Sequence, residues 1–318
     1  MLRVTDHGTW RMIDVEGRVV VNGYLVKLRK PIKTKLSAET IERLVRVKAD
    51  WWLDEMGRRA DVGYIRKRLE GIVRPYGGFE GRTVLDVGSG SGSSALTMSD
   101  AGAASVIGVE PDPEFVDLAK RRAQDEGVAD RVQFRLIKNT TKLPFRNGAF
   151  DIVTFHAVIE HIPPALRAPI LKEAYRCLRP GGLLVITETP NRAFPFDHHT
   201  TRLPLIPWLP LSISVPIARR FSRVAKRGMT KKGYIAAGIV GGSYWQVRKA
   251  LPEIICLDLL DSAARRFCSR RTCSPITYGG LRFVEWILNA LRLPLTAILP
   301  SLDLAFIKPA ASIRHKEH

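Results

Sequence analysis

A glycine-rich turn with an acidic residue on each side carries the clearest chemical signal in the sequence. Gly88, Gly90 and Gly92 alternate with serines directly after an apolar run. Glycine permits positive φ and a close approach of backbone to a ligand, and the helix expected next offers free amide groups. Asp86 can meet a cationic amino group, and Glu110, at the end of the next apolar run, can accept both hydroxyls of a ribose. The pattern therefore predicts a nucleoside site.

Histidines form the second group of residues that could do chemistry. Imidazole titrates near neutral pH, so it suits general acid–base catalysis. His198 and His199 are adjacent, with Asp197 before them as a carboxylate that could orient a ring. His161 follows a glutamate, where a hydrogen bond that fixes a loop is the alternative to catalysis. We predict that a general base, where one is needed, comes from the His198/His199 pair first and from His161 second.

The elements that must position these residues follow from hydrophobic periodicity. Short apolar runs read as strands, and patterns with apolar residues three or four apart read as helices. Their regular alternation predicts a mostly parallel sheet with helices on both faces, so ligand chemistry belongs at the carboxyl ends of the strands. The expected strands are 83–87, 105–109, 132–136, 150–155 and 183–187, and the expected helices between them are 93–101, 112–124 and 165–178.

Four parts are expected along the chain. Residues 1–36 form a β-hairpin extension, because Asn22-Gly23 between two β-branched runs fits a type I′ turn. Residues 37–189 form the cofactor-binding core with leading helices, which begin at Ser37 as N-cap. Residues 190–242 are a basic, proline-rich insertion, and residues 243–318 complete the sheet and end in an amphipathic region. Within this last part a helix over 243–251 and strands over 254–259 and 302–307 are expected.

Several further stretches make the pattern specific. Residues 139–145 read Asn-Thr-Thr-Lys-Leu-Pro-Phe, and residues 150–153 read Phe-Asp-Ile-Val. Residues 158–162 contain the Glu-His pair, and residues 178–182 read Leu-Arg-Pro-Gly-Gly. Together with the glycine turn, these stretches resemble, motif by motif over residues 80–189, the class I S-adenosylmethionine-dependent methyltransferases of the small-molecule, ubiquinone- and menaquinone-biosynthesis-like type.

The resemblance implies a doubly wound, mostly parallel, seven-stranded Rossmann-like α/β sheet with an inserted lid on the acceptor side. It also implies S-adenosyl-L-methionine as cofactor, with the glycine turn on its methionine part and Glu110 on its ribose. Asn139 stands where the family usually has Asp, and its carbonyl can still accept the hydrogens of the adenine amino group. The implied cofactor-binding residues are Asp86, Gly88, Ser89, Gly90, Glu110, Pro111, Asp112, Asn139, Thr140 and His156.

Other interpretations stay open at this point. A GxGxG turn alone also fits any tight strand-to-helix connection, and a nicotinamide dinucleotide would call for GxGxxG. An RNA methyltransferase is the first alternative to a small-molecule enzyme, because the chain is strongly basic. It lacks the Asp/Asn-Pro-Pro-Tyr/Phe tetrad of amino-methylating enzymes, since residues 155–158 read Phe-His-Ala-Val. A non-catalytic scaffold that binds the cofactor is the second alternative.

The net charge and the composition limit the classes of partner that the protein can have. The 318 residues contain 50 Lys and Arg against 31 Asp and Glu, which gives a net charge of +19. Such an excess favours nucleic acid, an anionic membrane surface or an acidic substrate as partner. The uncharged, proline-rich stretch 203–218 is too short to span a membrane, but beside the basic run that follows it could lie among lipid headgroups. Its alternative role is a lid that packs over the acceptor pocket.

The remaining expectations concern location and metals. The four cysteines have neither disulfide-framework nor zinc-ligand spacing, so we predict a reduced, cytoplasmic setting and no metal site. Residues 1–11 lack the apolar core of a secretory signal. We predict a methyltransferase that acts on a small-molecule or lipid-linked acceptor, most readily on oxygen, in the cytoplasm with peripheral contact at the inner membrane face. Nucleic acid is disfavoured as a partner.

Overall fold

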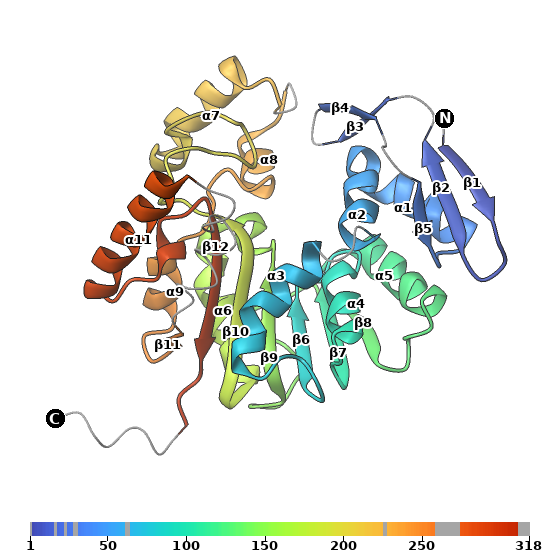
Figure 1. Ribbon diagram of the computed structural model, residues 1–318, viewed down its shortest axis with the longest axis horizontal. Coiled ribbons are helices and arrows are strands. Elements are labelled where there is room, and N and C mark those ends of the chain that lie inside the picture. Colours follow the sequence, from blue (N-terminus) through green and yellow to red (C-terminus); the bar gives the residue numbers. More distant parts are fainter. Residues whose placement is uncertain are drawn as a thin grey trace. The chain divides into compact units, whose positions relative to one another are not determined.

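Figure 1 shows the computed structural model as a ribbon coloured along the sequence. The chain divides into two compact units, residues 1–139 and 140–318, and each is described by itself. The four-part division expected from the sequence stays a prediction. The structure describes residues 2–15, 18–21, 24–27, 31–60, 64–224, 228–257 and 274–310.

The first unit begins with short antiparallel strands. One three-stranded sheet has the order β1-β2-β5, and β3 pairs with β4 so that Val21 lies opposite Tyr24. This pairing is what the expected hairpin requires, although the turn Asn22-Gly23 itself lies outside the described residues. The strands are β1 (Leu2–Asp6), β2 (Arg11–Val15), β3 (Arg18–Val21), β4 (Tyr24–Lys27) and β5 (Ile32–Thr34).

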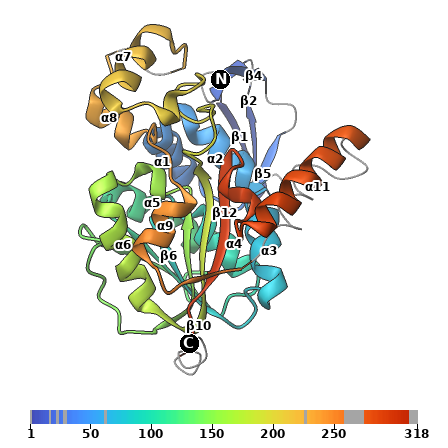
Figure 2. The same ribbon diagram turned by 90° about the vertical axis from the view of Figure 1, so that its left-hand side faces the viewer.

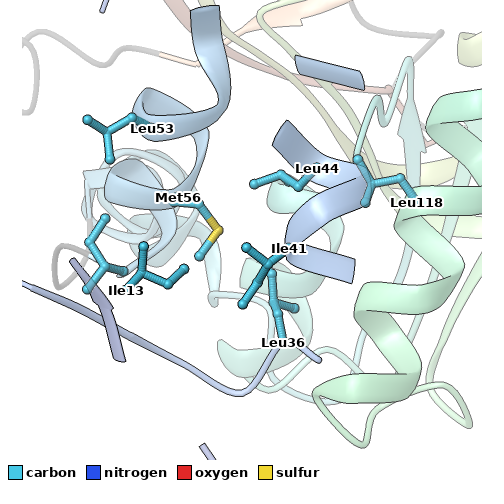
Figure 3. Close-up of a cluster of buried hydrophobic side chains, with 8 residues drawn as sticks. Ile13, Leu36, Ile41, Leu44, Leu53, Met56 and Leu118 are labelled. Atoms are coloured by element: carbon cyan, nitrogen blue, oxygen red, sulfur yellow. The ribbon is translucent and has the colours of Figure 1, made fainter. Parts of the chain in front are cut away.

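Helices α1 (Ala38–Lys48), α2 (Trp52–Ala60) and α3 (Tyr64–Val73) follow, with the 3₁₀ turn η1 (Ala49–Trp51) before α2. Ser37 caps α1 as expected, since its side chain accepts a hydrogen bond from the Thr40 amide. The apolar stripes of α1 and α2 bury against the small sheet and against α5 (Figure 3). The buried side chains of this cluster are Ile13, Ile32, Leu36, Ile41, Leu44, Leu53, Met56 and Leu118.

Alternating strands and helices complete the first unit. Strands β6, β7 and β8 are parallel neighbours (Figure 1). Strands β6 and β7 are mostly buried, as in a sheet covered on both faces, whereas the edge strand β8 buries Val132 and Phe134 and exposes Gln133 and Arg135 between and after them. The elements are η2 (Arg74–Tyr76), β6 (Thr83–Val87), α4 (Ser93–Asp100), β7 (Ser105–Glu110), α5 (Pro113–Asp125) and β8 (Val132–Leu136).

In the second unit β9 (Phe150–His156) and β10 (Leu178–Pro190) are parallel and are joined through α6 (Pro164–Cys177). Strand β12 (Ser301–Ile307) is antiparallel to β10, and the two-residue β11 (Ile255–Cys256) pairs with β12. The full strand order is β11-β12-β10-β9-β6-β7-β8. This order confirms the predicted seven-stranded, mostly parallel α/β sheet. Of the strand expected over 254–259, residues 255 and 256 form β11, and residues 258 and 259 lie outside the described residues.

The inserted region is largely helical and has a small core of its own. The 3₁₀ turn η4 (Ile206–Trp208) and helices α7 (Leu211–Phe221) and α8 (Lys231–Ala236) pack around Tyr234 and Val215. Helices α7 and α8 lie side by side in both ribbon views (Figure 2). Helices α9 (Tyr244–Ala250) and α11 (Pro275–Ala290) and the turn η5 (Leu295–Ala297) follow. Among the described residues, no helix has both the length and the apolar character of a membrane span.

Candidate active site

The glycine turn between β6 and α4 has a backbone that only glycine adopts without strain. The φ angles of Gly88, Gly90 and Gly92 are +73°, +50° and +89°. A Cβ on Gly92 would come within 2.8 Å of Phe134 Cζ, so this glycine packs the turn against β8. A Cβ on Gly90 would meet nothing within 4 Å, so the backbone there is open to an incoming ligand.

Glu110 ends β7 beside this turn and is held in one orientation. Its Oε2 accepts the Gly90 amide at 3.0 Å, and its Oε1 accepts the Asp112 amide at 3.1 Å. Burial raises the pKa of the carboxyl, while the Asp112 and Gly90 amides act in the lowering direction. Each carboxylate oxygen keeps an acceptor site beyond these bonds. A vicinal diol could therefore bind here through both hydroxyls.

Two buried polar groups near the turn indicate whether a nucleoside that carries an amino group fits there. Asp86 is 1% exposed and accepts the Ser94 hydroxyl at 2.5 Å. Ser89 Oγ is buried without a hydrogen-bond partner, which is costly unless a ligand or water supplies one. At and beside the turn, the structure thus has a fixed carboxylate that can accept a diol and a backbone open to a ligand. It also has the buried carboxylate of Asp86 and the buried, unpartnered hydroxyl of Ser89. These features fit S-adenosylmethionine.

A buried ionic cluster that the sequence did not indicate holds the turn from the side of α2. Glu55 accepts hydrogen bonds from Ser93 and, at 2.7 Å, from Ser91. The guanidinium of Arg122, 1% exposed, donates to Glu55 Oε1 at 3.0 Å and to the Ser91 carbonyl at 2.9 Å. Lys48 adds a second cation 3.1 Å from Glu55. No periodicity or motif marks such long-range partners.

The Glu55 cluster makes stability depend on pH. Burial by itself would raise the pKa of Glu55, but Lys48, Arg122 and the two serine hydroxyls hold it well below 4.5. A carboxyl with a lowered folded-state pKa stabilises the fold above its unfolded pKa, and that contribution is lost as pH falls through the folded value. We expect Glu55→Gln to lower the unfolding free energy by about 3 kcal/mol at neutral pH, with the difference shrinking below about pH 4.5.

Chemical denaturation across a pH series measures this difference. Glu39→Gln is the matched control, because Glu39 is 74% exposed and pairs with Arg121 on the surface, where such pairs contribute about 0–1 kcal/mol. Equal losses in both variants, or a Glu55→Gln loss that is constant down to low pH, would contradict the buried-pair account.

The other predicted cofactor residues lie around the ends of β7 and β8. Asp112 caps α5, with its Oδ1 accepting the Glu114 amide at 2.8 Å. Pro111 and Asn139 are exposed, the latter after β8, and Thr140 is the first residue of the second unit. Their role in holding the cofactor stays a prediction.

His156, at the end of β9, is fixed by two neighbours on β10. Its Nδ1 lies 2.7 Å from Thr187 Oγ1, and its Nε2 lies 3.2 Å from Glu188 Oε2. Glu188 has φ +57°, a left-handed conformation that is strained for a side chain with a Cβ. The strand pairing shifts at the same place, between Ile186 and Thr189. Sequence reasoning named His156 but missed Glu188.

The predicted pair His198 and His199 separates in the structure. The Nε2 atom of His198 lies 3.5 Å from Ser301 Oγ, whereas the ring of His199 meets that of His161 edge-on, with centroids 5.7 Å apart. The Asp197 carboxylate binds backbone amides: it accepts hydrogen bonds from the amides of His199, Thr200 and Thr201 at 2.9–3.1 Å. Its part is therefore to hold the turn.

His161 and His199 differ in their surroundings. The Nδ1 atom of His161 lies 2.6 Å from the Ala236 carbonyl, and 44% of its side chain is exposed. Burial, followed by the charge of His161, lowers the pKa of His199 to about 4. His199 is therefore neutral at physiological pH. The structure brings together two of the three predicted catalytic histidines.

Part of the chain is similar to known proteins. Residues 85–186 match a family model described as a methyltransferase domain. A ubiquinone biosynthesis O-methyltransferase of Acinetobacter baylyi is 32% identical over 145 residues, which cover 45% of this chain and 59% of that protein. An uncharacterized methyltransferase of Mycobacterium sp. strain KMS is 39% identical over 124 residues, 39% of this chain and 44% of the relative. The chain thus spans about half the length of these relatives.

Solved structures with a similar outline include a methyltransferase of Methanosarcina mazei. It is 29% identical with a TM-score of 0.34, and the alignment covers 38% of this chain and 57% of that one. Geranyl diphosphate C-methyltransferase of Streptomyces coelicolor A3(2) is 16% identical with a TM-score of 0.47, and covers 81% of this chain and 84% of that one.

Proposed function

We propose that this chain, which contains a class I S-adenosylmethionine-dependent methyltransferase domain, transfers a methyl group to an oxygen atom of a small-molecule or lipid-linked acceptor. The observation that carries the proposal is the Glu110 carboxylate, fixed by two backbone amides beside the open backbone of Gly90. S-adenosylmethionine, the cofactor of this class, supplies an electrophilic methyl group on a sulfonium centre.

The residues of the first unit bind and orient the cofactor in this proposal. Glu110 accepts the two ribose hydroxyls, while Asp86 and the turn around Ser89 receive the amino acid part. Asn139 accepts from the adenine amino group, and Pro111 and Asp112 line the ribose. Thr140 and His156, which belong to the second unit, stay predicted cofactor residues. Buried carboxylates at fixed positions bind without reorganising, and this lowers the entropic cost of holding a reactive geometry.

An oxygen acceptor calls for removal of its proton, and the histidines of the second unit suit that task. The carbonyl of Ala236 can only accept a hydrogen, so His161 carries its hydrogen on Nδ1 and keeps a lone pair on Nε2. We propose that the acceptor hydroxyl loses its proton at the His161/His199 pair. His198, next to Ser301, is the remaining candidate for this role.

The acceptor class follows from the apolar and cationic surface of the second unit. Trp208, Ile213 and Phe221 of the inserted region are 55%, 47% and 62% exposed, and Arg219-Arg220 lie among them. Phe283 and Trp286 of α11 are 61% and 67% exposed. We propose that these residues rest on an anionic membrane at its cytoplasmic face and admit an amphipathic acceptor. Apolar side chains beside cations are typical of interfacial binding.

Membrane contact predicts co-sedimentation with vesicles. The protein is expected to sediment with phosphatidylglycerol vesicles at low salt, to be released as salt rises, and to ignore phosphatidylcholine vesicles, because the attraction is electrostatic and screened. Trp286→Ser is expected to reduce the bound fraction several-fold, whereas Trp51→Ser, which removes a 46% exposed tryptophan of the first unit, leaves it unchanged. If the bound fraction changes with neither salt concentration nor lipid charge, the remaining role of the inserted region is that of a lid over the acceptor pocket.

Methyl transfer itself is tested by incubation with a labelled methyl donor and fractionated extracts. Label is expected in an amphipathic or lipid fraction, in a product stable to mild base as an ether is. Label in RNA, together with a salt-dependent gel shift, would replace the small-molecule proposal by the nucleic-acid alternative. Cofactor binding without label in any fraction would favour a scaffold.

A further inference from the structure

Three side chains of metal-ligand type converge in the second unit. Glu160 and His161 belong to the 3₁₀ turn η3 (Ile159–His161), and His199 lies in the turn after Asp197. Within the described part of the chain, one potential ligand atom from each of the three lies within 4.8 Å of the others. Glu160 and His161 are adjacent, but His199 is distant from them in sequence, so no familiar ligand spacing indicates the set.

An orphaned carboxylate oxygen points into this cluster. Glu160 is fully buried, and its Oε2 accepts the Thr189 hydroxyl at 3.2 Å. Its Oε1 is buried without a hydrogen-bond partner, and His161 Nε2 lies 3.8 Å from it. A buried carboxylate oxygen left in this state costs free energy unless something positive joins it. A cation between the carboxylate and the rings would satisfy it.

Both histidines are held in the form that a metal ion requires. The Ala236 carbonyl accepts from His161 Nδ1, which leaves the lone pair of Nε2 on the side of Glu160. The Thr200 hydroxyl donates to the Ala237 carbonyl, so it accepts from His199 Nδ1 at 3.3 Å. His199 thus also keeps its lone pair on Nε2. Ligating histidines are oriented in this way by hydrogen bonds from the other ring nitrogen.

The backbone leaves space for the cluster at one residue. Gly238 has φ +92°, and a Cβ there would lie 3.1 Å from Glu160 Cγ and 3.2 Å from His199 Nδ1. A side chain at this position would press on both potential ligands. The absence of a side chain at Gly238 therefore leaves room for the Glu160 carboxylate and the His199 ring beside it.

We propose that Glu160, His161 and His199 bind one divalent transition-metal ion, of the zinc, cobalt or iron(II) type. Two imidazoles and a carboxylate favour these ions over magnesium or calcium, which prefer oxygen ligands. Three protein ligands leave a coordination position for water or substrate, as in catalytic sites.

The role of the ion rests on the proposed function. Bound to the open position, the acceptor hydroxyl loses its proton to solvent water more readily, because the cation stabilises the oxyanion that forms. The oxygen then keeps the electron pair that makes the new bond to carbon. This refines the role proposed above for the His161/His199 pair: with the ion bound, the two rings promote loss of the proton as ligands of the metal, whereas without it they act as a free base.

Cobalt titration of the chelator-treated, full-length protein tests the binding. We expect one Co²⁺ per chain, with the intense visible absorption of a four- or five-coordinate site, and its displacement by Zn²⁺. Glu160→Gln keeps the shape and the Thr189 contact but loses the charge, and His199→Gln removes a ring. Each is expected to weaken Co²⁺ binding by about 100-fold or more, and Thr200→Val by about 10-fold. Thermal unfolding of each variant without metal checks that it is folded.

Two control variants test whether other histidines contribute to the Co²⁺ absorption. His7→Gln removes a histidine of the first unit that stacks on Trp10, and a double replacement of His315 and His318 by Gln removes the C-terminal ones. Both are expected to bind Co²⁺ as the wild type does. A featureless titration, or loss of binding in a control but not in Glu160→Gln, would overturn the site.

The two proposals fail separately. Co²⁺ binding at the cluster without methyl transfer to any acceptor would remove the proposed function and leave the metal site. Methyl transfer that is unchanged after chelation, in a protein that takes up no Co²⁺, would remove the metal site and leave a free imidazole as base.

Discussion

Replacing Glu110 by Ala is expected to weaken S-adenosylmethionine binding by on the order of 100-fold, about 3 kcal/mol, because two hydrogen bonds to a buried charge are lost. The carboxylate is 8% exposed and is already oriented by the Gly90 and Asp112 amides, so the wild type does not have to organise it on binding. Calorimetric titration with the cofactor and with its demethylated product measures the change.

Glu114→Ala is the matched control for Glu110→Ala. Glu114 lies in the first turn of α5, is exposed, and has the same charge, so its loss changes the long-range field by a similar amount. Its affinity for the cofactor is expected to stay within about twofold of the wild type, since exposed charges are screened by solvent. Wild-type affinity in Glu110→Ala, or no binding by the wild type, would remove the nucleoside site on which the proposed function depends.

The second large effect concerns the histidines of the second unit. His161→Ala and His199→Ala are each expected to lower turnover by about 100-fold or more, within the range for a group that helps proton removal. The cofactor affinity is expected to persist, because the carboxylates that bind it lie in the first unit. Single-turnover rates with saturating cofactor, measured across pH, separate the two quantities.

His198→Ala decides between the members of the predicted pair. The structure directs His198 Nε2 toward Ser301 and the ring of His199 toward His161, so a large loss is expected at 199 and a small one at 198. The opposite pattern would move proton removal to the Ser301 side of the site. Unchanged turnover in all three variants would contradict both general-base and metal-assisted removal of the proton.

The strands and helices of the core could be predicted from the sequence because periodicity reports burial directly. The expected strands 83–87 and 132–136 coincide with β6 and β8, and Ser37 caps α1. The expected strand 183–187 lies inside the longer β10, which begins at Leu178 where a helix end with a loop was expected. The cofactor class and the mostly parallel, seven-stranded sheet were likewise confirmed.

Contacts between distant residues could not be predicted in the same way. Glu55 reaches the glycine turn from a helix whose sequence reads simply as amphipathic. Glu188 lies beside His156 because two parallel strands end together, and its positive φ follows from the irregular pairing with β12. Asp197 is of a type that could orient a neighbouring ring, but in the structure its carboxylate accepts the backbone amides of the residues that follow.

The hydrogen bonds of Glu55 with Ser91, Ser93 and Arg122 limit how segments of this protein can be exchanged with those of related enzymes. The family match begins at residue 85, so a transplant of that segment alone would carry a buried guanidinium without its counter-ion. The upstream helices are therefore an inseparable part of the cofactor half, and chimaeras among related enzymes should exchange the two together.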